Sequence, residues 1–192
     1  TFEVTDYRTG ESLTNFSVLP QDLLVGDRAY CNTRGILHVV DQSADVLVRF
    51  HSTNLPLFNY RGQRIELLNK LRTLKGTAVG DWNVYLFRDN REKVKARICA
   101  IRKSKEAIEK TKKAILKAAS KKQRKVKPET LEYAEYVILF ITVNRHRLKK
   151  ADVMELYRAR WQVELSFKRL KGIMDLGHLH KSDPESCKAW LY

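Results

Sequence analysis

The chain has 192 residues, of which 43% are hydrophobic, and 37 Lys or Arg against 22 Asp or Glu give it a net charge of +15. This length and composition can supply a hydrophobic core, which excludes a chain that is disordered throughout. The charge favours a polyanionic partner, with a basic protein that has no such partner as the alternative.

Cysteine usage and hydropathy exclude further classes. Cys31, Cys99 and Cys187 are odd in number and lack metal-ligand spacing, which argues against a disulfide framework or a zinc site. The longest apolar run, residues 136–143, is far shorter than the roughly 20 residues of a membrane span. Residues 1–6 do not resemble a signal peptide. We expect a protein of the reducing cytoplasm that has no membrane partner.

The first part of the chain, residues 1–54, predicts several strands. The sequence begins without Met in an alternating pattern at Phe2 and Val4, as if cut short at its amino end, and a turn follows. The apolar run 23–25 predicts a buried strand with Asp27 at its carboxyl end. Further strands are predicted over residues 36–40 and 46–50.

Residues 55–130 differ from the first part of the chain in the pattern of their predicted elements. Short β-prone segments at 64–68, 82–87 and 94–98, separated by Gly or Asp-Asn, predict a β-rich insertion. Residues 101–127 then predict a basic amphipathic helix that Pro128 ends. Its lysines could contact DNA phosphates, or they could form an ordinary solvated face. The candidates at its carboxyl end are Lys121, Lys122, Arg124 and Lys125.

The last part, residues 131–192, predicts one strand and two helices. Residues 136–143 are apolar at successive positions, which is typical of a central strand covered on both faces. A long helix is predicted from about residue 153 to 174, with Asp152 as the cap of its first turn, and another begins near residues 182–184.

The long helix carries the most informative pattern. At about 100° per residue, Tyr157, Arg160, Glu164 and Lys171 fall within an arc of roughly 60°. A neighbouring arc holds an apolar set that we expect to pack on the sheet: Leu156, Val163, Phe167, Leu170 and Met174. The polar quartet would then lie at the rim of the buried face. The alternative is an ordinary Arg-Glu pair on an exposed helix, worth a few tenths of a kcal/mol.

The quartet has a known counterpart. Tyr157, Arg160, Glu164 and Lys171, at these gaps, resemble the Tyr-Arg-Glu-Lys signature of the insertion-sequence-four family of DDE transposases. Residues 26–30, Gly-Asp-Arg-Ala-Tyr, resemble the second-aspartate motif of that family, and the similarity extends to residues 9–12 and 52–57.

The resemblance implies an α/β chain with an RNase-H-like, retroviral-integrase-like catalytic core, in which two Asp and one Glu hold divalent ions. Asp27 and Glu164 would be the second and third ligands, Mg²⁺ the cofactor, and Mn²⁺ a substitute. DNA contacts are implied for Tyr157, Arg160 and Lys171, and we add the adjacent Arg28, Tyr30 and Lys168. Trp82 and Tyr136 are candidates for stacking on a flipped base, although a core position is the favoured role of Trp82.

The family's first Asp lies well upstream of residues 9–12, and only Asp6 is available here, at a turn. We therefore expect an incomplete metal site. The predicted function is cut-and-paste transposition in the bacterial cytoplasm, at the nucleoid, by a protein that pairs transposon ends as a homodimer. The alternatives are a non-catalytic DNA-binding remnant and a metal-dependent nuclease of the same fold.

Overall fold

The computed structural model describes residues 12–88 and 92–173, and the chain divides into two compact units. One unit is formed by Ser12–Met154 and contains the sheet. The described part of the other is residues 155–173, which belong to a long helix. The strand predicted at Phe2 and Val4 and the helix predicted near 182–184 lie outside the described residues.

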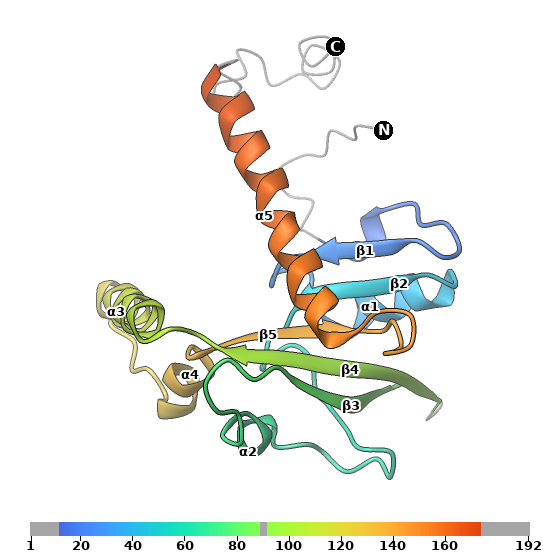
Figure 1. The fold of residues 1–192 in the computed structure, drawn as a ribbon, viewed down its shortest axis with the longest axis horizontal. Coiled ribbons are helices and arrows are strands. Elements are labelled where there is room, and N and C mark those ends of the chain that lie inside the picture. Colours follow the sequence, from blue (N-terminus) through green and yellow to red (C-terminus); the bar gives the residue numbers. More distant parts are fainter. Residues whose placement is uncertain (1–11, 89–91, 174–192) are drawn as a thin grey trace. The chain divides into compact units, whose positions relative to one another are not determined.

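A five-stranded sheet organises the larger unit, with the strand order β1-β2-β5-β4-β3 (Figure 1). The β1 and β2 strands are parallel, while β2–β5, β5–β4 and β4–β3 are antiparallel. The mixed α/β class predicted from the sequence is confirmed. The strands are β1 (Leu23–Gly26), β2 (Asp45–Arg49), β3 (Gly80–Phe87), β4 (Lys93–Arg102) and β5 (Tyr136–Ile141).

A helix joins the two parallel strands. The predicted strand over residues 36–40 is wrong, because this segment belongs to α1 (Thr33–Asp41). The side chain of Asn32 caps that helix by accepting a hydrogen bond from the Gly35 amide at 2.8 Å. Ile36 and Val39 are fully buried, at the i, i+3 spacing of a helical face. A short 3-10 helix, η1 (Leu13–Asn15), packs against α1.

The segment 55–130 supplies two strands of the same sheet. Its strands β3 and β4 confirm the predictions over 82–87 and 94–98, and β4 pairs with β5. The strand predicted over 64–68 is wrong, because Leu67 begins a helix, α2 (Leu67–Leu71). In α2, Leu67, Leu68 and Leu71 are all buried, as the i, i+1, i+4 positions of one helical face would be.

The basic helix is shorter than predicted. It is α3 (Lys105–Lys121), which starts late because β4 continues to Arg102, and the Ser104 side chain caps it. The role predicted for Pro128 as the helix terminator is wrong. Pro128 instead begins another helix, α4 (Pro128–Tyr133), where its missing N–H costs no hydrogen bond.

The core lies on both faces of the central strand, as predicted for residues 136–143. In β5, Ile138 and Phe140 belong to the main core with α1 and α2, whereas Leu139 and Ile141 are fully buried on the opposite face. Figure 1 shows β5 between β2 and β4. The aligned registers place Val48, Phe140 and Ile98 in one row across the sheet.

The last described element is α5 (Lys150–Ile173), which confirms the predicted long helix. It begins before Asp152, so this residue lies in the first turn instead of capping it. Val153 is fully buried, but Leu170 is 44% exposed. The predicted packing of this apolar face on the sheet would join residues of both units, and it stays a prediction.

Candidate functional site

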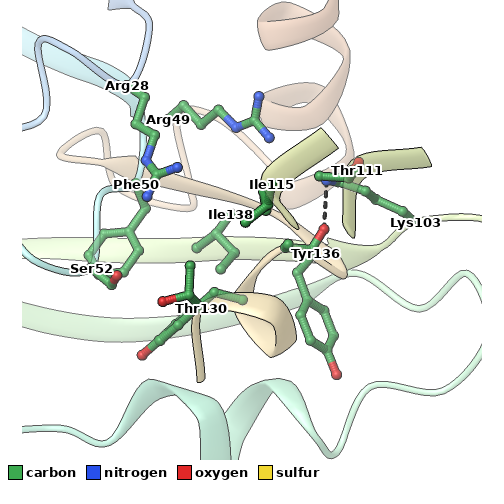
Figure 2. Close-up of a pocket in the computed structure, with 12 residues that line it drawn as sticks. Arg28, Arg49, Phe50, Ser52, Lys103, Thr111, Ile115, Thr130, Tyr136 and Ile138 are labelled. Carbon is green, nitrogen blue, oxygen red and sulfur yellow. Dashed lines mark hydrogen bonds between the residues drawn. The ribbon is translucent and has the colours of Figure 1, made fainter. Parts of the chain in front are cut away.

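Asp27 directly follows β1, as the sequence predicts for a residue at the carboxyl end of that strand. One of its carboxylate oxygens, Oδ1, accepts a hydrogen bond from the Ala29 amide at 2.7 Å, which fixes the side chain at the start of a turn. Arg28, the next residue, lines a pocket at this end of the sheet (Figure 2).

The space around the residue before Asp27 is tight. A side chain carbon built on Gly26 would lie 3.2 Å from the Cβ and Cδ2 atoms of Tyr30 and from Cγ1 of Val48. Glycine therefore lets the turn that carries Asp27 close onto the sheet. This contact gives a structural reason for a Gly-Asp pair followed by Tyr30 three residues later.

A thiol ties this turn to the end of β2. The His51 amide donates to the Cys31 sulfur at a nitrogen-to-sulfur distance of 3.3 Å. Burial raises the pKa of Cys31 to about 11, so the thiol is neutral and acts as a small apolar group. Burial and the nearby Arg28 lower the pKa of His51. The turn that carries Asp27 is thus held by the close contact of Gly26 with Val48 before it and by the hydrogen bond of Cys31 with His51 after it.

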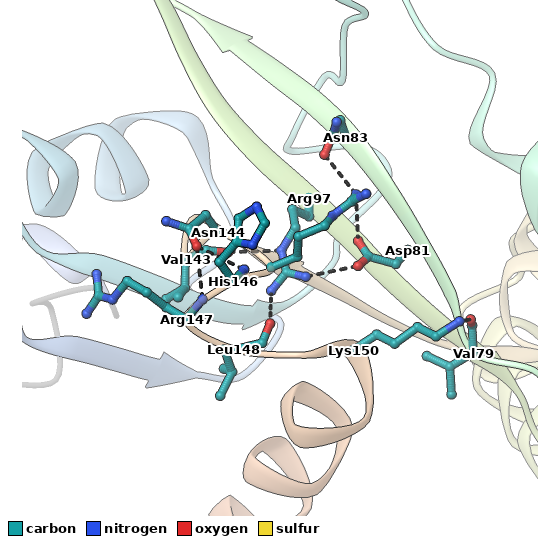
Figure 3. Close-up of polar contacts among 11 residues, drawn as sticks. Val79, Asp81, Asn83, Arg97, Val143, Asn144, His146, Arg147, Leu148 and Lys150 are labelled. Carbon is teal, nitrogen blue, oxygen red and sulfur yellow. Dashed lines mark hydrogen bonds and ion pairs between the residues drawn. The ribbon is translucent and has the colours of Figure 1, made fainter.

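An ion pair inside the sheet holds the segment that leads into α5 (Figure 3). Arg97 of β4 is 2% exposed and donates to Asp81 of β3 at 3.0 Å. The same guanidinium donates to the carbonyl oxygens of Val143 at 2.9 Å and Leu148 at 2.7 Å. It therefore fixes the connection between β5 and α5. The prediction from sequence did not single out Arg97, although a lone Arg in the apolar run Ala96-Arg-Ile-Cys-Ala100 is a signal of a buried, paired charge.

The smaller unit carries most of the predicted quartet. Arg160 donates to a carboxylate oxygen of Glu164 at 2.6 Å, and its guanidinium lies over the Tyr157 ring at 5.1 Å from the centroid. Burial alone would lower the pKa of Arg160, but the contacts with Glu164 and Tyr157 outweigh it, so the pKa is raised. Lys168 is exposed, and the side chain of Lys171 lies outside the described residues.

The two candidate metal ligands belong to different units, Asp27 to the larger one and Glu164 to the smaller one. Their meeting at a shared ion stays a prediction. Each has one carboxylate oxygen, Asp27 Oδ2 and Glu164 Oε2, for which the described part of the chain provides no hydrogen-bond donor. Within the described ranges, no group of three or more His, Cys, Asp or Glu is arranged to hold a metal. Asp6 lies outside those ranges.

The two stacking candidates lie among core residues of the sheet. Trp82 pairs in register with Ile98 and packs partly buried against the main core. Tyr136 is 5% exposed. A packing role fits both positions. The basic candidates at the carboxyl end of α3 are all exposed: Lys121, Lys122, Arg124 and Lys125. No described helix is long and apolar enough to cross a membrane.

Comparison with known proteins assigns the chain to a family. Residues 4–192 match the family model described as "Transposase DDE domain". The chain is 31% identical over 196 residues to the "Transposase for insertion sequence element IS421" of Escherichia coli, and the match covers 100% of this chain and 53% of the relative. The same identity and coverage hold for the Escherichia coli K12 protein "Putative transposase InsL for insertion sequence element IS186A". The chain thus spans about half the length of these relatives. It belongs to the transposase DDE domain family.

Proposed function

We propose that this chain is the catalytic domain of a DNA transposase with an RNase-H-like core, which cuts and joins DNA by phosphoryl transfer. The observation that carries the proposal is the position of Asp27 at the carboxyl end of β1, in a parallel β1-α1-β2 unit. In open α/β sheets, ligands bind at the carboxyl ends of parallel strands. A family match that reaches residue 192 includes the Glu164 helix as well.

The carboxylates have suitable chemistry for a divalent ion. Asp27 and Glu164 would hold it through Oδ2 and Oε2, and carboxylate oxygens are preferred ligands of Mg²⁺ and are accepted by Mn²⁺. When bound, such ions activate the attacking oxygen and neutralise the leaving oxygen of the phosphodiester. The first Asp of the family's site would complete the ligand set.

The protein side chains then bind and orient the DNA. Arg160 is held by Glu164 and Tyr157, so its guanidinium is ordered before a phosphate arrives. The exposed cations at the end of α3 add phosphate contacts outside the site. We also propose that two copies pair the element ends, and that the protein works at the nucleoid in the bacterial cytoplasm.

The test is strand cleavage by the protein as encoded, on duplexes that carry the DNA flanking its coding sequence, with Mg²⁺ or Mn²⁺. We expect cleavage and joining with the parent, and loss of both with Glu164→Ala. The control is Glu155→Ala, an exposed carboxylate of the same helix. Unimpaired cleavage by Glu164→Ala contradicts the proposal.

The other outcomes identify the alternatives. DNA binding without cleavage in either metal would indicate the non-catalytic remnant, which no finding favours. Cut ends that are released without joining would indicate a nuclease.

A further inference from the structure

Three cations surround one pocket of the larger unit. Arg28 follows Asp27, Arg49 ends β2, and Lys103 follows β4, and all three line a cavity of about 90 Å³ (Figure 2). This is well above the roughly 10–15 Å³ that one water needs. Ser52 and Thr130 add hydroxyl groups to its wall. The cavity can thus admit a group larger than a single water.

No carboxylate of the described residues neutralises these cations. Two acidic side chains near the pocket are engaged elsewhere, since Glu132 pairs with Arg72, and Glu135 pairs with Arg102 and Lys112. Glu129 of helix α4 does not line the pocket. Lys103 donates to the Ala134 carbonyl at 2.7 Å and to Thr111 at 3.3 Å, which leaves one of its three donors. Arg28 and Arg49 make no side-chain hydrogen bond to any described acceptor.

The crowding has an electrostatic cost. Partial burial lowers the pKa of Lys103, and the positive charges of Arg49 and Arg28 lower it further. Burial, followed by the charge of Arg49, also lowers the pKa of Arg28. Like charges held together in a partly desolvated cavity oppose folding, and an anion between them would relieve the repulsion.

The pocket lies at the same end of the sheet as Asp27. The β1 and β2 strands are parallel, so Arg49, which ends β2, and Asp27, which follows β1, lie at the same end of the sheet. Because β5 is antiparallel to β2, its first residue, Tyr136, lies at this end and lines the pocket. Helix α3 contributes Thr111 and Ile115, so the basic helix borders the cavity.

We propose that the pocket formed by Arg28, Arg49 and Lys103 binds one backbone phosphate of the DNA and thereby orients the duplex beside Asp27. The identity of the anion as DNA rests on the proposed function, whereas the phosphate site itself rests on the pocket. Arginine and lysine donors with flanking hydroxyl groups are the usual partners of phosphate oxygens.

The test uses the full chain without divalent metal, so catalysis plays no part. The pocket variant is Arg49→Gln with Lys103→Gln. The control is Arg61→Gln with Lys75→Gln, which removes the same charge from exposed positions outside the pocket. Duplex binding is measured by fluorescence anisotropy across a salt series. Loss of one phosphate contact lowers the slope of log K against log[salt] by about 0.9. We expect that change, with about tenfold weaker binding, in the pocket variant but not in the control.

A second arm uses inorganic phosphate as the probe, at the ionic strength of a chloride reference. We expect phosphate to raise the melting temperature of the parent and the control more than that of the pocket variant. Without phosphate, the single variant Arg49→Gln should melt no lower than the parent, because it removes one crowded cation and leaves the hydrogen bonds of Lys103 in place. If the double variant does not fold, Arg49→Gln alone replaces it.

The outcomes separate the two proposals. A phosphate effect that is lost in the pocket variant while its duplex binding stays unchanged would limit the pocket to free anions and overturn the DNA assignment. Equal effects of the pocket and control variants in both arms would overturn the site altogether. If Glu164→Ala keeps full cleavage while the pocket variant loses DNA affinity, the proposed chemistry fails and the phosphate site stands.

Discussion

Arg160 donates a 2.6 Å hydrogen bond to Glu164 across one turn of α5. Arg160 has 18% of its side chain exposed and Glu164 has 50%. If Glu164 binds a metal, the positive charge of Arg160 repels that metal ion and attracts a DNA phosphate. We therefore predict that Arg160→Gln weakens duplex binding and strengthens Mn²⁺ binding. The stability of the helix should change by only a few tenths of a kcal/mol. Anisotropy measures the affinity for the duplex, and calorimetry measures the affinity for Mn²⁺. A fall of both affinities would contradict the role of Glu164 as a metal ligand opposed by Arg160.

The buried ion pair predicts a large loss of stability. Replacing Arg97 by Met leaves the carbonyl oxygens of Val143 and Leu148 without their donor, and of the cations described in the structure Asp81 keeps only the more distant Arg145 at 3.5 Å. Removal of one partner of a buried pair costs about 3–5 kcal/mol. Arg145→Met is the matched control, since its side chain is 47% exposed and such pairs contribute about 0–1 kcal/mol. Urea unfolding compares the free energies of unfolding of the two variants, and equal losses of stability would refute a special role for Arg97.

Replacement of two glycines by alanine should change the stability of the protein in opposite directions. Gly26→Ala brings a methyl group to 3.2 Å from Tyr30 and Val48, and overpacking of this kind costs about 1–3 kcal/mol. Gly172, in α5, has no described atom within 4 Å of the added carbon. Gly172→Ala should gain up to about 1 kcal/mol through helix propensity. Thermal melting measures both. A stabilised Gly26→Ala would mean that the turn carrying Asp27 is looser than described.

The buried thiols predict a pH dependence. Burial raises the pKa of Cys31 to about 11 and that of Cys99 to about 12, from a reference of 9.0. The folded state therefore prefers the neutral thiols, and their contribution to stability is complete below pH 9 and falls as the pH rises through 11 and 12. At pH 8, alkylation by iodoacetamide should be at least about 100-fold slower than for an exposed thiol, because the thiolate is the reactive form.

Peptide mass spectrometry follows the modification at each cysteine separately, and a urea-unfolded sample supplies the control rates. Rapid alkylation of Cys31 in the folded chain at pH 8 would show that the thiol is not held between the Asp27 turn and β2.

Most strands could be predicted because their signal is local. Residues 23–25 and 136–143 are apolar at successive positions, and both form strands. The strands expected over 36–40 and 64–68 are helical for reasons that hydropathy alone does not show. Asn32 caps α1, and the three leucines of α2 match a helical face as well as a strand. Short apolar runs are ambiguous until a capping side chain or packing partner decides.

The candidate site was predictable only in part. The spacing of Tyr157, Arg160 and Glu164 follows from one helix, and the structure has the expected Arg160–Glu164 pair. The cationic pocket combines Arg28, Arg49 and Lys103 from three distant segments, and only the pairing of β1, β2, β5 and β4 brings them to one end of the sheet. A single sequence has no pattern that encodes such a juxtaposition.

The proposed function requires that Asp27 and Glu164 share one divalent ion. Iron-directed cleavage tests it: Fe²⁺ replaces Mg²⁺ in the protein as encoded, ascorbate and peroxide generate radicals at the bound ion, and mass spectrometry maps the cut peptide bonds. We predict cuts near both residue 27 and residue 164 in the parent. Either Asp27→Asn or Glu164→Gln should abolish both sets, and excess Mg²⁺ should suppress them. Cuts near one residue that survive substitution of the other would contradict the shared site.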